Sequence, residues 1–421
     1  MAAYADLLAR LDGAAQSLGV ELGLERVRVA LARLGDPQKR FAAVQLAGTN
    51  GKGSTAAMTE AVLRGAGLRT GLTTSPHLAR FTERIRIAGV EVDGDRLAAL
   101  DERIVATGVP LTYFEIATVL AFLAFAEAGV EIAVLETGLG GRLDAVTTSE
   151  PLATAITSIG FDHLAYLGDT LTAIAGEKAG ILKPNVPCFL GRLPEEARAE
   201  IARRANEVGA PLRYFGRDFS PPSGPLGLAG PHQRDNAAIA VALARAATER
   251  LGRPLAAPTI ADGLAHTTWP GRLERIGDDV LLDCAHNADG ARALAAALPA
   301  LAAGRRVVLL MSVAEDKQPR AIFEALGPLA YALVATRADS PRAVPAEALA
   351  LEAARFVARR VAVADPWDAL AEARRRAAGG LVVICGSMFL VGPLRARLLG
   401  EPLDPRRTSD PVSRDVRRRR S

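Results

Sequence analysis

The chain alternates short apolar, β-branched runs with longer stretches rich in alanine, leucine and arginine along most of its 421 residues. This alternation predicts a parallel α/β architecture, because each buried strand is followed by a helix that returns the chain to the same edge of the sheet. The alternation restarts after Trp269-Pro270-Gly271, a sequence typical of a turn. We therefore expect two α/β domains with mostly parallel sheets, one over residues 1–268 and a smaller one over residues 269–400.

The expected elements follow from this pattern. In the first domain we expect strands at 42–47, 69–73, 131–135, 153–159 and 186–190, and helices at 56–66, 115–128 and 195–208. In the second domain we expect strands at 279–283, 306–311, 331–335, 360–363 and 381–385, and helices at 289–302, 319–326 and 367–377. Residues 217–231 are rich in proline and glycine and are expected to form a loop.

The composition limits the environment in which the chain works. Hydrophobic residues make up 49% of the sequence, enough for a sizeable core. No apolar run approaches the roughly 20 residues needed to span a bilayer. The N-terminus has the pattern of an amphipathic helix and not of a signal peptide. Three cysteines lie far apart in apolar stretches, which favours buried packing over a disulfide framework or a thiolate metal site. We expect a cytoplasmic protein with no membrane partner.

The positive charge is concentrated at the C-terminus. The net charge is +4, and residues 401–421 carry seven arginines against four acidic residues. The rest of the chain is therefore almost neutral, so the charge predicts no nucleic-acid partner. The last 21 residues, 401–421, have three prolines and no apolar periodicity, and we expect a disordered basic tail there.

One segment has the composition of a phosphate cradle. Gly48-Thr49-Asn50-Gly51-Lys52-Gly53-Ser54-Thr55 follows an apolar run and precedes an expected helix from Ala56. Glycines let backbone N–H groups face a phosphate, the helix N-terminus adds positive potential, and Lys52 reaches the outer phosphates. The usual P-loop pattern would place a glycine at Leu46 and a hydroxyl residue directly after Lys52. A plain glycine-rich turn between strand and helix is the alternative.

Three other charged groups stand at informative positions in the first domain. Glu136 ends an apolar run before a glycine-rich loop, where it suits either Mg²⁺ binding or a turn. His163 follows the end of another expected strand, where a metal-ligand role and a structural role are equally open. Lys178 is surrounded in sequence by small apolar residues instead of the polar neighbours of a solvated helix.

The second domain offers two candidate segments. Arg272 lies in Pro-Gly-Arg-Leu-Glu, and the expected strand at 279–283 ends in Asp283-Cys284-Ala285-His286-Asn287. Taken alone, the second segment is a strand-to-helix turn with Asn287 or Asp289 as its N-cap.

Together, the motifs resemble one family, the folylpolyglutamate synthase/dihydrofolate synthase family of the Mur ligase superfamily. The resemblance covers about residues 20–398, and the ordered set of motifs is more specific than any one of them. The motifs are Gly48–Thr55, Thr74-Ser-Pro-His77, Glu136-Thr-Gly-Leu-Gly-Gly-Arg-Leu-Asp144, Glu177-Lys-Ala-Gly-Ile181, His232-Gln-x-x-Asn-Ala237, Pro270-Gly-Arg272 and Asp283-x-Ala-His-Asn287.

The resemblance implies an N-terminal P-loop-type ATPase domain with a mostly parallel sheet and a smaller C-terminal Rossmann-like α/β domain. It also implies ATP and two Mg²⁺ ions, one held by Ser54 and Glu136 and the other by His163 and Glu136. It implies that Lys178 is carbamylated, and partial burial suits this because carbamylation needs a neutral amine. The implied catalytic residues are Lys52, Lys178 and His286. The implied nucleotide-binding residues are Gly48, Thr49, Asn50, Gly51, Lys52, Gly53, Ser54, Thr55, Asn236, Arg272 and Asp283.

The resemblance also implies the substrates. Dihydropteroate or a reduced folate would bind at Ser75, Pro76, His77, Arg84 and Asp144, with a cis Ser75–Pro76 bond. The implied reaction is an ATP-dependent ligation of L-glutamate to dihydropteroate or to the γ-carboxyl of a folate through an acyl phosphate, performed by a monomer. Another Mur-type amino-acid ligase, or a nucleotide-binding regulator without ligase activity, is the alternative.

Overall fold

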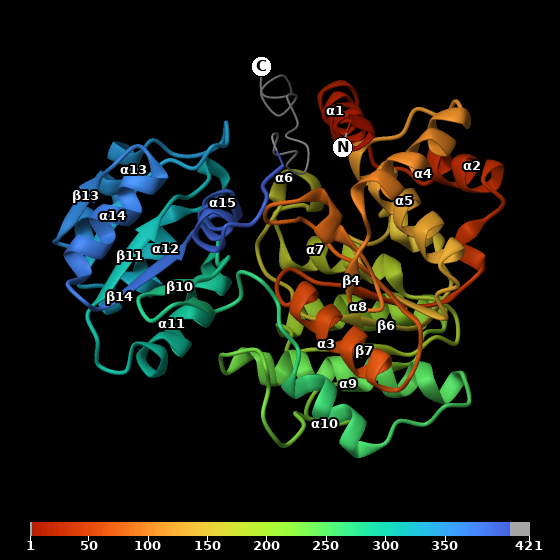
Figure 1. Cartoon of the computed structure of the whole chain (residues 1–421). Coiled ribbons are helices and arrows are strands. Elements are labelled where there is room, and N and C mark those ends of the chain that lie inside the picture. The colour runs from red at the N-terminus through yellow and green to blue at the C-terminus, as the bar shows by residue number, and fades with distance from the viewer. Residues whose placement is uncertain (1, 405–421) are drawn as a thin grey trace. The chain divides into compact units, whose positions relative to one another are not determined.

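The computed structural model describes residues 2–404, and these residues form two compact units (Figure 1). Within the described residues, unit 1 contains residues 2–227, 234–267 and 404, and unit 2 contains residues 228–233 and 268–403. Within the described residues, no helix is both long enough and apolar enough to cross a membrane. The predicted tail at 401–421 falls mainly on residues 405–421, which lie outside the described residues, whereas residues 401–404 are part of the described chain.

Unit 1 is built on an eight-stranded sheet with the order β4-β3-β2-β5-β1-β6-β7-β8. The β3 and β4 strands are antiparallel to their neighbours, and the other strands pair in parallel. The strands are β1 (Ala42–Ala47), β2 (Thr70–Thr73), β3 (Ile85–Ile87), β4 (Val90–Glu91), β5 (Ile132–Glu136), β6 (Pro151–Ile156), β7 (Cys188–Leu190) and β8 (Leu212–Tyr214).

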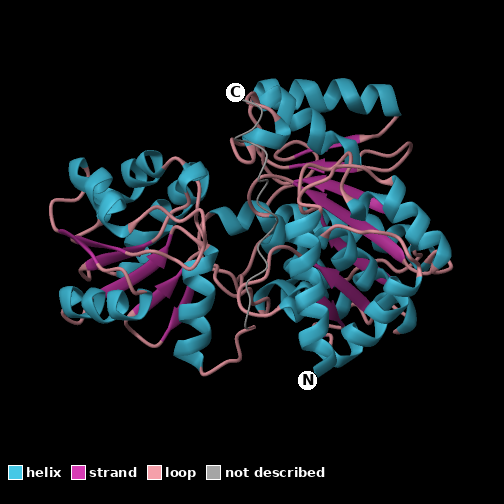
Figure 2. Cartoon of the chain, turned by 90° about the horizontal axis from the view of Figure 1, so that it is seen from above, coloured by secondary structure: helices cyan, strands magenta, loops and turns pink. Residues whose placement is uncertain are grey.

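Helices lie on both faces of this sheet (Figure 2). The α5 helix is buried on nearly all sides, and its capping box, formed by Thr112 and Glu115, fixes where it begins. Phe122 and Phe125 of α5 pack against Phe41 beside β1, with ring centroids 5.9 and 5.7 Å apart. The helices are α1 (Ala2–Ser17), α2 (Glu25–Arg33), α3 (Lys52–Gly65), α4 (Gly94–Ala106), α5 (Tyr113–Glu127), α6 (Leu164–Leu167), α7 (Leu171–Lys178), α8 (Glu195–Val208), α9 (His232–Arg250) and α10 (Ala257–Ala265).

Unit 2 has a six-stranded sheet with the order β13-β12-β11-β14-β10-β9, in which only β9 is antiparallel to its neighbour. Its strands are β9 (Glu274–Ile276), β10 (Val280–Leu282), β11 (Val307–Met311), β12 (Ala332–Ala335), β13 (Arg360–Ala362) and β14 (Leu381–Cys385). Its helices are α11 (Ala288–Ala302), α12 (Pro319–Leu326), α13 (Ala346–Glu352), α14 (Pro366–Ala377) and α15 (Met388–Leu399). Buried Leu, Val and Ala side chains form its core.

The α/β prediction is confirmed, and the ten expected strands all correspond to strands of the two sheets. The predicted start of a helix at Ala56 is wrong by one turn. The α3 helix begins at Lys52, because Gly51 has a φ of +86° and provides the left-handed residue from which the helix starts. Strands β3, β4, β8 and β9 were not expected, since each has only two or three residues, too few to give a recognisable pattern.

The three cysteines are unpaired and buried. Cys188 lies in β7 of unit 1, Cys385 ends β14 of unit 2, and Cys284 follows β10 in the same unit. Burial raises the pKa of Cys188 and that of Cys284 to about 12. These thiols are therefore packing groups and not thiolate ligands, as expected from their apolar surroundings.

Candidate active site

The phosphate loop, residues Gly48–Thr55, joins the end of β1 to α3 at the carboxyl edge of the parallel strands. Its backbone requires glycine at two positions. Gly48 has a φ of +151°, and a Cβ added there would lie 2.0 Å from Thr157 Oγ1. Gly51 has a φ of +86°, and its Cβ would lie 2.5 Å from Asn236 Oδ1. The loop is thus shaped by close approaches that any side chain would block.

Hydroxyl groups after β6 brace the phosphate loop. Thr157 Oγ1 donates to Asn50 O at 2.6 Å, and Asn50 N donates to Ser158 Oγ at 2.9 Å. Thr49 N donates to Ser158 O at 2.9 Å, and Gly160 N donates to Thr49 Oγ1 at 3.1 Å. These bonds fix Thr49 and Asn50, two of the predicted nucleotide-binding residues, before any ligand arrives.

Two lysines converge on one carbonyl oxygen of this loop. Lys52 Nζ and Lys178 Nζ donate to Gly48 O at 3.0 and 2.9 Å. Lys52 Nζ also lies 3.9 Å from Glu136 Oε1, at the end of β5. The structure therefore brings together three predicted residues from sequence positions 52, 136 and 178.

The environment of Lys178 favours the neutral amine. The residue is 5% exposed and ends α7. Burial lowers the pKa of its amine to about 7, and the positive charge of Lys52 acts in the same direction, whereas Asp162 and Asp144 oppose the shift. The amine of Lys178 is therefore able to react with an electrophile near neutral pH, which an ordinary surface lysine is not.

The predicted magnesium ligands are a hydroxyl, a carboxylate and an imidazole. Ser54 lies in the first turn of α3 and Glu136 at the end of β5, and both are buried. His163 has a φ of +52°, and its side chain is 41% exposed. Within the described residues, no group of three or more His, Cys, Asp or Glu side chains is arranged to hold a metal. This donor set fits Mg²⁺, which takes one or two carboxylates and completes its shell with phosphate oxygens and water.

The predicted substrate loop, Thr74–His77, follows β2 and lies beside Glu136. Ser75 N donates to Glu136 Oε2 at 3.2 Å, and the predicted cis bond between Ser75 and Pro76 is confirmed. His77 is partly exposed, and its Nδ1 accepts a hydrogen bond from Arg84 Nε at 2.9 Å. Arg84 is 1% exposed, so its contacts in this structure are with protein groups.

Asp144 shapes the glycine-rich loop after β5. Its carboxylate accepts hydrogen bonds from the backbone N–H groups of Gly138, Leu139 and Val146 at 2.8, 2.9 and 3.1 Å. Burial raises the pKa of Asp144 to about 7, although these donors and the charge of Lys52 favour the ionised form. Its predicted contact with the substrate stays a prediction.

Unit 2 carries the remaining predicted residues within the Arg272 loop, residues 270–274, and the turn after β10. Asp283 accepts from Leu273 N at 3.0 Å and from Ala285 N at 2.9 Å, and burial raises the pKa of Asp283. His286 Nδ1 lies 2.9 Å from Cys284 O. The N-cap alternative is also correct locally, because the side chain of Asn287 accepts from Gly290 N at 2.9 Å and caps α11.

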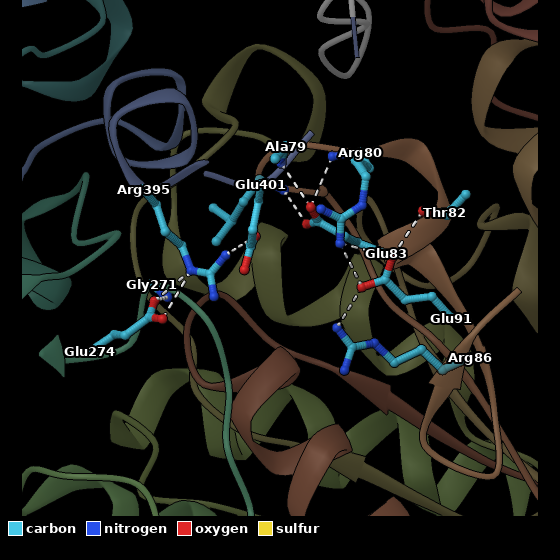
Figure 3. A network of polar contacts seen from close by, with 11 residues as sticks. Ala79, Arg80, Thr82, Glu83, Arg86, Glu91, Gly271, Glu274, Arg395 and Glu401 are labelled. Carbon is cyan, nitrogen blue, oxygen red and sulfur yellow. Dashed lines mark hydrogen bonds and ion pairs between the residues drawn. The ribbon is translucent and has the colours of Figure 1, made fainter. Parts of the chain in front are cut away.

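A second carboxylate holds the Arg272 loop (Figure 3). Glu274 Oε2 accepts from Gly271 N at 2.7 Å, and Arg395 Nε lies 2.9 Å from each oxygen of Glu274. Arg395 Nη1 donates to Glu401 at 2.5 Å. Because Gly271 directly precedes Arg272, this chain of ionic hydrogen bonds sets the backbone from which the Arg272 side chain extends.

Sequence reasoning missed the residues that support these loops. Thr157 and Ser158 adjoin predicted motifs, and their position at the end of β6 was the available signal. Glu274 and Arg395 are separated by 121 positions, so no local pattern connects them. Asn236 lies against Gly51 in unit 1, whereas Arg272, Asp283 and His286 belong to unit 2.

Both units contain segments that match known domain families. Residues 46–219 match the Mur ligase middle domain, and residues 271–388 match the Mur ligase glutamate ligase domain. The dihydrofolate synthase/folylpolyglutamate synthase of Bacillus subtilis (strain 168) is 34% identical to the chain, over 94% of the chain and 99% of the relative.

Solved structures agree with the sequence comparison. A Mycobacterium tuberculosis folylpolyglutamate synthase complexed with ADP and AMPPCP matches with a TM-score of 0.87 and 31% identity, over 95% of this chain and 99% of that one. A bifunctional folylpolyglutamate synthase/dihydrofolate synthase with Mn, AMPPNP and L-glutamate bound matches with a TM-score of 0.83 and 33% identity, over 94% and 98% of the two chains.

Proposed function

The chain belongs to the dihydrofolate synthase/folylpolyglutamate synthase family of Mur ligases, and from this premise we propose which of its residues carry the reaction. The protein is an ATP-dependent ligase that adds L-glutamate to dihydropteroate, giving dihydrofolate, and to the γ-carboxyl of folates. The observation that carries the assignment of residues is the convergence of Lys52, Glu136 and Lys178 around the phosphate loop.

The chemistry requires an activated carboxylate. The carboxylate oxygen of the substrate attacks the γ-phosphorus of ATP, and the bond to the β-phosphate oxygen breaks to release ADP. The amine of L-glutamate then attacks the acyl carbon, loses a proton, and displaces inorganic phosphate. Bringing a carboxylate to a triphosphate is opposed by charge, so cations and N–H donors fixed in advance are the main contribution of the protein.

In this proposal the phosphate loop binds the β- and γ-phosphates. The N-terminus of α3 and the backbone N–H groups of Gly48–Thr55 face the phosphates, and Lys52 supplies a positive charge next to Glu136. The hydroxyl-braced backbone supports this role, because a fixed loop loses little entropy when the nucleotide binds.

Ser54, Glu136 and His163 would hold the divalent ions, and a bound Mg²⁺ would neutralise charge between the phosphates and the attacking carboxylate. Glu136 is the central residue of this set because it receives contacts from both the phosphate loop and the substrate loop. The Mn ion in the related ligase structure supports a divalent ion as a family cofactor.

Lys178 is proposed to carry a carbamate. Its neutral amine would attack CO₂ and lose a proton, giving an N-carboxylate that adds a negative group near the ion-binding residues. Its burial and its lowered amine pKa support this modification.

In unit 2, Arg272 is proposed to contact the ATP phosphates, Asp283 the nucleotide, and His286 the reacting end of the substrates. Asn236, on α9 of unit 1, would contact the nucleotide beside Gly51. Hydrogen bonds to Gly271 N and Leu273 N support these roles. They hold the main chain of the Arg272 loop, and this fixes the place from which its side chains extend.

We also propose a cytoplasmic monomer. The three reduced, buried cysteines suit a reducing compartment. The exposed large apolar side chains of the described residues are dispersed along the chain, as in a protein without a large apolar interface. Light scattering after gel filtration measures the oligomeric state directly, and a mass of twice 44.1 kDa would contradict the proposal.

The function is tested by incubating the protein with ATP, Mg²⁺ and L-glutamate, with dihydropteroate or tetrahydrofolate as acceptor. We expect ADP formation to require an acceptor, and the acceptor to gain the mass of one glutamyl residue. ADP formation that is unaffected by both pterins would overturn the folate assignment. It would instead favour a Mur-type ligase with another acceptor.

A further inference from the structure

The substrate loop is held by a carboxylate whose role no sequence motif indicates. Glu83 accepts hydrogen bonds from the backbone N–H groups of Leu78, Ala79 and Arg80 at 2.7, 3.0 and 2.8 Å (Figure 3). Three N–H donors on one ionised carboxylate make a strong, charge-assisted set. They fix the main chain directly after His77.

A second carboxylate holds the other side of the same segment. Asp404 accepts from Phe81 N at 2.7 Å and from the hydroxyl of Tyr4 at 2.9 Å. Asp404 N in turn donates to Ala79 O at 3.0 Å. With Glu83 and Asp404 in place, the segment from residue 78 to residue 81 has little freedom, so the residues at its ends keep a fixed separation.

Arg84 ends the short helical turn Phe81–Arg84 that follows this segment, and its side chain reaches back to His77. Its guanidinium carbon is 5.0 Å from the ring centroid of Tyr113 and 5.9 Å from that of Phe81. Aromatic faces stabilise the cation, and an arginine stays protonated even when buried. Arg84 Nε therefore always presents a proton to His77 Nδ1, 2.9 Å away.

This contact determines the protonation of His77. Nδ1 accepts a hydrogen bond from Arg84, so it carries no proton itself. The single ring proton of a neutral His77 must therefore be on Nε2. The His77 ring also packs edge-on against Phe81, with centroids 6.2 Å apart, which limits its rotation. Partial burial of the ring, together with the charge of Arg84, holds the pKa of His77 well below its usual value, in agreement with a neutral ring.

We propose that Arg84 is a positioning residue that fixes His77 as the Nε2–H tautomer, so that the substrate loop presents a neutral hydrogen-bond donor to an acceptor atom of the pterin-bearing substrate. This inference depends on the proposed function, in which the loop binds that substrate. It gives Arg84 a different role from the direct substrate contact implied by the family resemblance. The burial of Arg84 favours the new role, because 1% exposure leaves no accessible surface for a ligand.

The tautomer is tested first in the unmodified protein. Long-range ¹H–¹⁵N correlation spectra of histidine-labelled protein distinguish protonated from unprotonated ring nitrogens, and the chain has only five histidines to assign. The signal lost in His77→Gln identifies His77. We expect an unprotonated Nδ1 and a protonated Nε2 between pH 6 and 8. A protonated Nδ1 in this range would overturn the proposal, whatever the behaviour of any variant.

The positioning role is tested by a double-mutant cycle. Arg84→Met keeps an unbranched side chain as far as the position of Nε but has no donor there. We expect it to raise KM for the pterin substrate about tenfold, the effect of one neutral hydrogen bond, with KM for ATP unchanged. His77→Ala should give a similar rise, and Arg84→Met should add nothing in the His77→Ala background. His77→Gln, which places an amide N–H near the Nε2 position, should restore most of the affinity.

The matched control is Arg86→Met. Arg86 is two residues further along in β3, and its guanidinium lies 3.4 Å from the carboxylate of Glu91 (Figure 3). Arg86→Met should leave both KM values and the His77 spectrum unchanged.

Multiplicative KM effects of Arg84→Met and His77→Ala would show that Arg84 acts independently of His77. Absence of turnover by the unmodified protein with any pterin would instead contradict the proposed function. If Arg84→Met does not fold, the His77→Gln and His77→Ala pair and the wild-type spectrum still decide the question.

Discussion

The phosphate loop of unit 1 and the Arg272 loop of unit 2 are each proposed to bind ATP, but they are held in different ways. The phosphate loop is shaped by glycines and neutral hydroxyls, with Gly48 packed against Thr157. The Arg272 loop is shaped by the carboxylates of the half-buried Glu274 and the buried Asp283, which accept hydrogen bonds from backbone N–H groups. A loop whose shape requires glycine should lose most of its function when one methyl group is added. A loop fixed by ionic hydrogen bonds should weaken gradually.

The largest effect is expected at Lys178, which shares the Gly48 carbonyl with Lys52. Lys178→Ala should lower kcat about 1,000-fold, because it removes the proposed carbamate from the ion-binding region. A short carboxylic acid such as acetate should restore part of the activity. Steady-state kinetics with and without acetate measure both effects.

The control for Lys178 is Lys183→Ala. Lys183 is half-buried, has a lowered pKa through burial, and donates to Thr147 O at 3.2 Å, away from the phosphate loop. It should retain nearly full activity. Equal losses in the two variants would contradict a specific role for Lys178.

A methyl group at Gly48 should have the next largest effect. Gly48→Ala places a Cβ 2.0 Å from Thr157 Oγ1, so the loop must shift, and we expect kcat/KM for ATP to fall about 100-fold. Gly67→Ala is the matched control, since Gly67 also has a positive φ, +79°, but no heavy atom within 4 Å of the added Cβ. It should lower the free energy of unfolding by about 1 kcal/mol and leave ATP kinetics intact. Similar ATP kinetics in the two variants would contradict steric control of the phosphate loop.

Enzyme activity should depend on pH through the protonation of the Lys178 amine. The amine pKa is about 7, so the ammonium form, which cannot attack CO₂, predominates as the pH falls below this value. The CO₂ pressure required for half-maximal activity should therefore rise at least about tenfold per pH unit below 7. Activity of Lys178→Ala rescued by acetate provides the control, since it should not respond to CO₂. A CO₂ requirement that does not change with pH would contradict carbamylation.

The smallest effect is expected in the Arg272 loop. Glu274→Gln retains an acceptor for Gly271 N but loses the charge that pairs with Arg395, and KM for ATP should rise about fivefold with little change in kcat. Glu372→Gln is the control within unit 2, because Glu372 pairs with Arg375 and Arg376 on α14. A loss at Glu274 as large as that at Gly48 would remove the distinction between the two kinds of loop.

The same difference explains what could be predicted from the sequence. The phosphate loop is contiguous, so its glycines, lysine and hydroxyls form a visible motif, and the strands around it are long apolar runs. The supports of the Arg272 loop come from β9, the turn after β10 and α15. Charged residues such as Glu274 and Arg395 look like surface residues in a sequence, because only the folded backbone shows which N–H group each one binds.

The substrate loop illustrates a further limit. Its Ser-Pro-His motif was visible and the cis bond was expected, but the direction of the Arg84 side chain was not predictable. A buried arginine and a substrate-binding arginine have the same sequence signature. Only the aromatic rings of Phe81 and Tyr113, one of them 29 positions away, distinguish the two cases.

The reactivity of the buried thiols measures how often the structure around each one opens. Because burial raises the pKa of Cys188 and that of Cys284 to about 12, an alkylating reagent reacts with these thiols only when the surrounding structure opens. Cys188 reports on the sheet of unit 1. Cys284, whose N–H donates to Gly271 O at 2.9 Å, reports on the Arg272 loop. Alkylation rates measured residue by residue by mass spectrometry therefore give separate opening free energies for the two units, without any engineered label.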